Sequence, residues 1–162
     1  MKSTATLSSC KKYRYSLTRE WDNKQGYVLF ICLNPSTADD KNDDPTLIRC
    51  INYAKGWGYG GVCIANLFAY RATKPKDMLS SKDPIGLDND KWLRKLSKGA
   101  GLVVAAWGNH GKHMARSDKI RQKFSNLYYL KLNASGEPSH PLYLKSNLKP
   151  ILYGKYGDKS DA

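Results

Sequence analysis

The stretch Tyr27–Asp39 decides the fold, and its sequence is YVLFICLNPSTAD. The residues up to Leu33 are continuously apolar, and Asn34-Pro35 then ends the run. A continuous apolar run of this kind is typical of a parallel strand that is buried on both faces. The polar residues behind it form a loop at the carboxyl end of the strand, and we expect the functional site to begin there.

Three further apolar runs indicate strands at Val62–Phe68, Leu102–Trp107 and Leu127–Leu132. Helical patterns precede them at 46–57, 87–98 and roughly 111–124. Apolar strands that alternate with helices predict right-handed βαβ units with helices on both faces of the sheet. The predicted fold class is therefore α/β, a three-layer α/β/α sandwich with a central, mainly parallel four-stranded sheet.

Local patterns at the two ends of the chain refine this layout. Apolar and polar residues alternate from Lys11 to Trp21, which predicts a half-exposed strand or hairpin arm. Asp44 is expected to cap the helix that Pro45 begins. We expect residues 1–10 to be a flexible N-terminus, 11–153 a single α/β domain, and 154–162 a flexible tail.

Composition excludes several classes of protein. The chain of 162 residues is 41% hydrophobic and 25% charged, which is typical of a soluble globular protein. Its apolar runs are too short for a bilayer span and its N-terminus lacks an apolar signal core, so we expect a cytoplasmic protein without a membrane partner. The four cysteines are widely spaced and form no CxxC pair, so no metal and no cofactor is predicted.

The net charge of +13 is unevenly distributed. Basic residues crowd the segments 71–98 and 112–123, whereas acidic residues gather between Asp39 and Asp44. Such one-sided charge is typical of proteins that bind a phosphate backbone, although it is also found on surfaces that only keep a protein soluble. The predicted partner is a nucleic acid, with DNA favoured, or a nucleotide. The oligomeric state is left open.

Five ordered motifs carry a family resemblance. They are LNPSTAD at 33–39, DDPT at 43–46, NLFAYRAT at 66–73, AWGNHG at 106–111 and HPLY at 140–143. Together they resemble the bacterial and phage family called domain of unknown function 1643 (DUF1643), over about Tyr13 to Tyr143. That family implies no settled activity.

The chain also resembles, more distantly, the uracil-DNA glycosylase superfamily. The loop Asn34-Pro35-Ser36 is similar to the loop after the first strand of that superfamily, and His140-Pro141 is similar to its histidine–proline motif. Ser36 stands where the superfamily usually has glycine. The resemblance implies a glycosylase-like fold and the cleavage of an N-glycosidic bond.

By this resemblance, Asn34 and His140 are the predicted catalytic residues. Asn34 would position a water, and His140 would donate a hydrogen bond to a carbonyl of the departing base. A carboxamide does not accept a proton near neutral pH, so the chemistry would depend on stabilising the leaving group. The alternative is that Asn34-Pro35 forms only a turn.

Eight further residues complete the predicted substrate site. Asn66 could read the Watson–Crick edge of a flipped base, and Phe68 or Tyr70 could stack on it. The alternatives are an amide that holds a loop and a phenylalanine in the core. Arg71 is either a phosphate contact or part of a solvated face, and Asn109 and His110 could bind phosphate at a helix start. The eight are Pro35, Ser36, Asn66, Phe68, Tyr70, Arg71, Asn109 and His110.

Two clusters could in principle hold a metal. Asp39, Asp40, Asp43 and Asp44 could bind a hard cation, but acidic residues before a helix also cap its amides. His110 and His113 are spaced one helical turn apart, without an identifiable third ligand. The interpretation preferred for both clusters involves no metal.

The leading hypothesis is an enzyme of glycosylase type that acts on a flipped base in nucleic acid. One alternative is a non-catalytic module that binds nucleic acid or a nucleotide in the same cleft. Another is a hydrolase of small nucleosides or nucleotides that uses the acidic loop and a metal.

Overall fold

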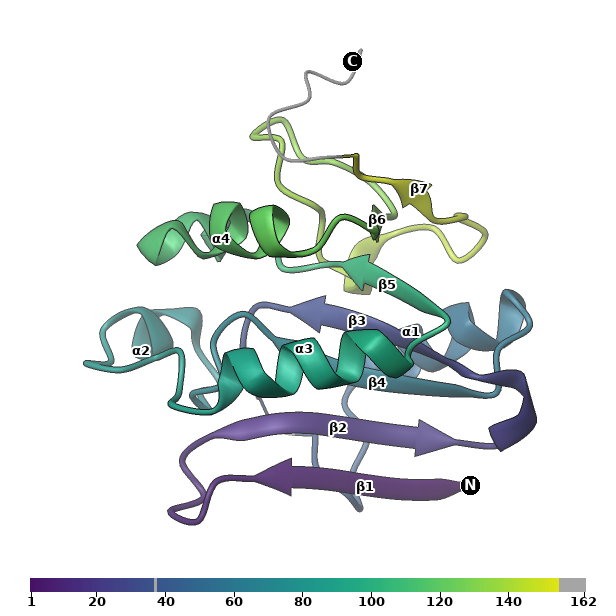
Figure 1. Ribbon diagram of the computed structural model, residues 1–162, viewed down its shortest axis with the longest axis horizontal. Helices are drawn as coiled ribbons and strands as arrows, with labels where there is room; N and C mark the ends of the chain where they lie inside the picture. Colours follow the sequence, from purple (N-terminus) through teal and green to yellow (C-terminus); the bar gives the residue numbers. More distant parts are fainter. Residues whose placement is uncertain (37, 155–162) are drawn as a thin grey trace.

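Strand β3 (Tyr27–Cys32) lies at the centre of a seven-stranded sheet in the computed structural model, which describes residues 1–36 and 38–154 (Figure 1). Strands β4 (Gly61–Asn66) and β5 (Leu102–Ala105) pair with it in parallel on its two sides. Strand β6 (Leu127–Tyr129) pairs in parallel with β5. These four strands are the four predicted ones, and they form the parallel core.

Three antiparallel strands extend this core, so the sheet is mixed and has seven strands, not four. β2 (Arg14–Glu20) pairs with β4, and β1 (Lys2–Leu7) pairs with β2. At the other edge, β7 (Ile151–Leu152) pairs with β6. Residues 2–7, which were expected to be flexible, therefore form an edge strand. Main-chain hydrogen bonds pair this strand with β2, and such bonds do not require an apolar sequence pattern.

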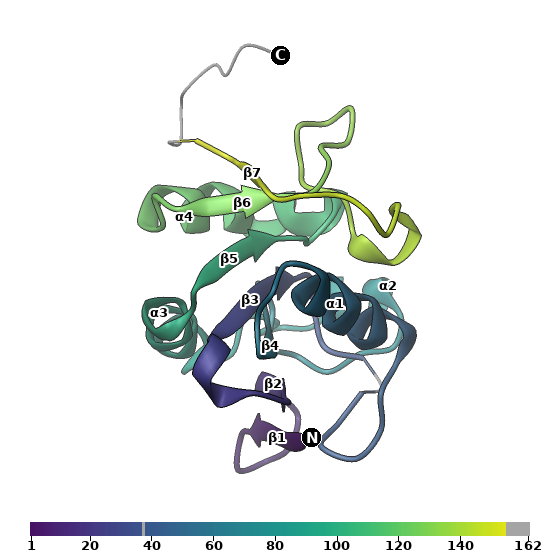
Figure 2. The same cartoon turned by 90° about the vertical axis from the view of Figure 1, so that its right-hand side faces the viewer.

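Helices cover both faces of the sheet and make three layers (Figure 2). On one side lies α1 (Pro45–Gly56), and on the other lie α3 (Asn89–Gly99) and α4 (Arg116–Lys123). Alternate residues of β3 serve the two sides: Val28 and Phe30 belong to the core beneath α1, and Leu29 and Ile31 to the opposite core. Because both faces are buried, the strand is apolar at every position.

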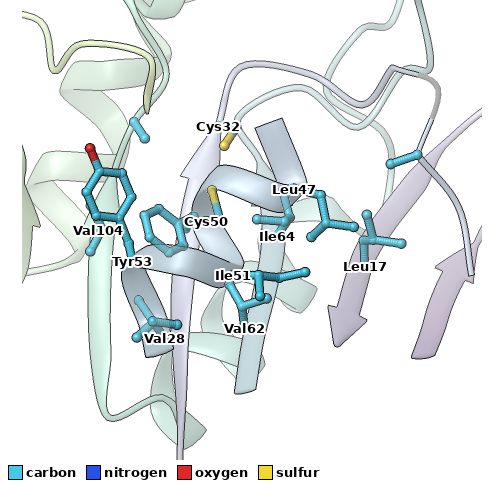
Figure 3. Packing of buried hydrophobic residues seen from close by; sticks show 14 of the residues in the cluster. Leu17, Val28, Cys32, Leu47, Cys50, Ile51, Tyr53, Val62, Ile64 and Val104 are labelled. Carbon is cyan, nitrogen blue, oxygen red and sulfur yellow. The ribbon is translucent and has the colours of Figure 1, made fainter. Parts of the chain in front are cut away.

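Helix α1 begins as predicted. The Asp44 carboxylate caps it by accepting a hydrogen bond of 2.8 Å from the Leu47 amide, and Pro45 is its first residue. Leu47, Cys50 and Ile51 turn toward the sheet (Figure 3). The cap therefore fixes the start of α1 directly behind the loop that follows β3.

The second and third predicted strands end two residues early, at Asn66 and Ala105, and two other predicted elements differ more. The segment expected to be one helix to residue 124 consists of a 3-10 helix, η2 (Asn109–Ala115), and α4, because Met114 and Ala115 adopt φ angles of 54° and 55°. The predicted fourth strand ends at Tyr129 instead of Leu132.

The remaining elements are short: η1 (Asn23–Gln25), α2 (Pro75–Leu79) and η3 (Pro141–Tyr143). In the part of the chain that is described, no helix is both long and apolar enough to cross a bilayer. The tail expected after residue 154 lies outside the described residues.

Candidate functional site

A cavity of about 340 Å³ lies at the carboxyl ends of β3 and β5. The chain leaves the carboxyl end of β3 toward α1 on one face of the sheet and leaves the carboxyl end of β5 toward α4 on the other face. The two loops therefore part at this point, which is where doubly wound sheets form their ligand crevice. The loops after β3, β4 and β5, the start of α1, and His140 all contribute to the wall.

The structure brings six of the ten predicted site residues together in this wall. Asn34 and Ser36 come from the loop after β3, Asn66 from the end of β4, and the other three from the segments that follow β5 and β6. The six are Asn34, Ser36, Asn66, Asn109, His110 and His140. Asn34 and His140 thus share one cavity although 106 positions separate them in the chain.

The other four predicted residues lie outside the cavity wall. Phe68 is fully buried and packs against the His113 ring at 5.5 Å between centroids, so it has no free face for a ligand. Pro35 is buried, and its carbonyl accepts a hydrogen bond from the Ala72 amide. Tyr70 and Arg71 line a separate surface hollow. Phe68 is therefore a core residue, which was the alternative interpretation of this position in the sequence.

The Asn66 side chain is the most unusual feature of the cavity. It is only 1% exposed, and neither its amide nitrogen nor its amide oxygen has a hydrogen-bond partner within the described residues. A buried polar group without a partner costs about 1–3 kcal/mol. The main chain is held firmly, because the Asn66 carbonyl accepts a hydrogen bond of 2.9 Å from Asn89 Nδ2. An amide fixed in this way is ready to pair with a bound molecule.

Two more buried donors of the wall lack partners, and the sequence analysis missed both. Neither Arg14 Nε nor the indole nitrogen of Trp107 has an acceptor in the described structure. Burial lowers the pKa of Arg14 to about 10, although the Asp44 carboxylate opposes this shift. The Trp107 ring lies against Gly111, where a Cβ atom would be 2.2 Å from ring atom Cδ1. The only indication of this packing in the sequence is the presence of glycines on both sides of the Asn109-His110 pair.

Asn34 holds two loops together and also faces the cavity. Its side-chain nitrogen donates to the carbonyls of Ala72, at 2.9 Å, and Pro35, at 3.1 Å. Its side-chain oxygen has no partner among the described residues and can accept a hydrogen bond from a water. The residue therefore joins the loop after β3 to the loop after β4 and leaves one acceptor for a ligand.

The hydrogen bond to His140 determines where its proton lies. His140 Nδ1 accepts a hydrogen bond of 3.2 Å from the Leu142 amide, so the neutral ring carries its proton on Nε2. Burial lowers the pKa of His140 from its usual value, with the Asp44 carboxylate acting in the opposite direction. At neutral pH the ring is therefore uncharged and can serve as a hydrogen-bond donor.

Asp44 was predicted as a helix cap, with a cation ligand as the alternative, and it also belongs to the cavity wall. Its two oxygens accept hydrogen bonds from the Leu47 amide and the Ser36 hydroxyl, at 2.8 Å and 3.1 Å. Among the described lining residues it is the only carboxylate, and Arg14 is the only guanidinium or ammonium group. Their opposite charges balance, so the cavity as a whole suits an uncharged polar ligand.

Lowering the pH below about 6.5 is expected to cost stability through His140. Because its folded-state pKa is lowered, the unfolded chain takes up the proton first, and the loss is complete once the pH is below the folded-state pKa. The measurement is the melting temperature between pH 8 and pH 4.5 for the wild type and His140→Gln. On acidification, the melting temperature of the wild type should fall further than that of His140→Gln. Equal falls in the two proteins would contradict the assigned role of His140 in this pH dependence.

The acidic loop has a structural role. Arg19, which is 1% exposed, forms an ion pair of 2.9 Å with Asp43 and donates to the carbonyls of Asp39 and Asn42. Hydrogen bonds from the Lys41 and Asn42 amides lower the pKa of Asp39. Within residues 1–36 and 38–154, no three His, Cys, Asp or Glu side chains are grouped to hold a metal ion. Of the two histidines, His110 lines the cavity, whereas His113 packs against Phe68.

The fold and the site define a doubly wound α/β protein with a polar, charge-balanced ligand cavity at the point where its connections part. Over residues 14–142 the chain matches the family described as "Protein of unknown function (DUF1643)", and it belongs to that family. No curated protein and no solved structure matches it.

Proposed function

We propose that the protein binds a base of nucleic acid in this cavity and hydrolyses the N-glycosidic bond between the base and its sugar. The observation that carries the proposal is the unpartnered, buried amide of Asn66. A carboxamide offers a donor and an acceptor side by side, which complements the neighbouring donor and acceptor on the edge of a base. A cavity of about 340 Å³ is within the size range of small-molecule sites and can enclose a base.

The proposed reaction breaks the bond between the sugar C1′ and the base nitrogen. The bonding electrons move onto the base, where a carbonyl oxygen takes up part of the negative charge. His140 Nε2–H donates a hydrogen bond to that oxygen, and Asn34 Oδ1 positions the water that attacks C1′. Asp44 stabilises the positive charge that develops on the sugar and accepts the proton of the water. That proton then neutralises the departed base.

Asn34 and His140 line the same cavity, which supports this mechanism. The mechanism implied by the similarity to uracil-DNA glycosylases needs both side chains at one site. The balanced charge of Arg14 and Asp44 supports a neutral heterocycle in the cavity rather than a phosphate.

A second candidate function is the binding of a base without cleavage. The observation that favours it is the structural use of the Asn34 amide, whose nitrogen already joins two loops and would be needed there without any catalysis. The two candidates share the Asn66 contact and differ only in whether free base is released.

The test is Asn66→Leu, which replaces the amide by an apolar group of similar size. Binding of the base should weaken by at least about fivefold, since a lost hydrogen-bonded pair is worth about 1–3 kcal/mol. The melting temperature should stay the same or rise, because an unpaired buried amide has been removed. Binding and base release are measured with oligonucleotides that carry uracil, hypoxanthine or a hypermodified pyrimidine. Asn52→Leu, on the exposed side of α1, is the matched control.

Unchanged binding in Asn66→Leu would contradict the proposed role of the amide. Release of free base by the wild type supports the glycosylase, whereas binding that depends on Asn66 without release supports the non-catalytic module.

A further inference from the structure

Helices α3 and α4 lie on the same side of the sheet, opposite α1 (Figure 2). A groove of about 390 Å³ is lined by residues of both helices. Leu93, Ile120 and Phe124 contribute its apolar surface. This groove is distinct from the cavity, because the two share no lining residue.

The two helices carry an unusual share of the charge of the protein. Together they contain eight lysine or arginine residues and two aspartates, which accounts for nearly half of the net charge of +13. Arg94, Lys98 and Lys123 line the groove itself, and all three are exposed. The groove is therefore strongly cationic.

The acidic residues of these helices neutralise only part of the groove. Among the described residues that line it, Asp90 is the only acidic one, and its carboxylate pairs with the buried Arg116 at 2.8 Å and with Lys123 at 3.5 Å. Asp118 lines a different hollow. Neither Arg94 nor Lys98 forms an ion pair with any described residue. Their charges are available to an anionic partner.

We propose that the groove between α3 and α4 binds the phosphate backbone of a nucleic-acid strand. The α3 residues that line the groove run from Asp90 to Lys98, about 12 Å along the helix axis at 1.5 Å per residue. This length matches about three to four nucleotides of a stacked strand at 3.4 Å each. The Ser97 hydroxyl on the groove wall already donates to the Arg94 carbonyl at 3.0 Å, so the donors that the groove offers to phosphate are its cationic side chains.

A nucleic acid fits this groove better than an acidic protein does. Arg94 and Lys98 lie one helical turn apart on α3, and Lys123 lies across the groove on α4, so cations line both walls of the groove and suit a strand with regularly repeated charges. The half-buried Phe124 ring adds an apolar surface on which a sugar or a base can lie. The inference does not depend on the chemistry proposed for the cavity.

The test compares two triple variants of the full chain that lower the net charge by the same amount. The groove variant is Arg94→Gln, Lys98→Gln and Lys123→Gln; the control is Lys2→Gln, Lys41→Gln and Lys145→Gln, which changes exposed lysines elsewhere. Binding to an unmodified 20-nucleotide single strand is measured by fluorescence anisotropy from 50 to 200 mM salt. Melting temperatures verify that both variants are folded.

The groove variant should bind the strand at least about tenfold more weakly at low salt, and the control within about twofold. The slope of log affinity against log salt should fall by about two, because each lost contact removes about 0.7 for a single strand. Equal weakening in both variants, or no binding by the wild type, would overturn the proposal. It would equally be overturned if poly-glutamate of matched charge displaced the strand at equal concentration. This assay uses an unmodified strand and the groove variant, whereas the cavity test uses a modified base and Asn66→Leu, so failure here and failure at the cavity are distinguishable.

Discussion

His140→Ala is expected to slow base release from a substrate oligonucleotide by about 10²- to 10³-fold, as the loss of one donor to a developing negative charge does elsewhere. The Nδ1 atom of His140 is engaged by the Leu142 amide, so its Nε2–H is the donor that the cavity offers. This hydrogen bond strengthens only as the base departs, and binding should therefore change by less than about threefold. Single-turnover release, followed by chromatography of the free base, measures the effect.

Two further variants make this result specific. His140→Gln keeps an uncharged N–H donor near the position of Nε2 and should recover part of the rate, whereas a merely structural role would show no such rescue. His113→Ala is the matched control, since His113 packs on Phe68 and does not line the cavity. Release by His140→Ala at the wild-type rate would contradict the assigned role.

Arg116→Met is expected to lower the free energy of unfolding by about 3 kcal/mol, the lower end of the cost of breaking a buried ion pair. Arg116 is 1% exposed, and its Nε and Nη2 atoms donate to the Leu67 carbonyl at 3.1 Å and 2.9 Å. Nη2 also donates to Asp90 at 2.8 Å. The carboxylate of Asp90 is 38% exposed and regains water when its partner is lost, which keeps the cost near this end of the range.

Urea unfolding of Arg116→Met measures this loss, with Lys119→Met on the exposed side of α4 as control. Because Leu67 directly follows Asn66, the variant should also weaken binding of the base in the cavity. A loss of stability below about 1 kcal/mol would mean that the ion pair with Asp90 contributes little to the fold.

The parallel core was predictable because burial on both faces leaves a simple record in the sequence. Val28, Leu29, Phe30 and Ile31 are all apolar since each faces one of two helical layers. The start of α1 was predictable for a local reason, because Asp44 and Pro45 favour a helix start without help from the rest of the chain.

The three antiparallel strands were much less visible. In β2, the alternation predicts an exposed Arg14, but Arg14 is only 3% exposed, and Arg19 further along the strand is only 1% exposed. Their guanidinium groups bind main-chain carbonyls of the loop around Ala38 and Asn42, which is distant in the sequence. An alternating pattern within β2 cannot show that these arginines are buried, because the loop that buries them belongs to a distant part of the sequence.

For the site, the chain order of polar loops behind apolar strands determined that Asn34, Asn66, Asn109 and His140 would gather at one edge of a sheet. Strand direction is enough for this, since parallel strands end on the same side. Only the tertiary structure decided that Phe68 belongs to the core and that Arg14 and Trp107 belong to the cavity wall. Whether a polar atom finds a partner depends on segments brought together by folding, so only the folded chain shows that Asn66 is left without one.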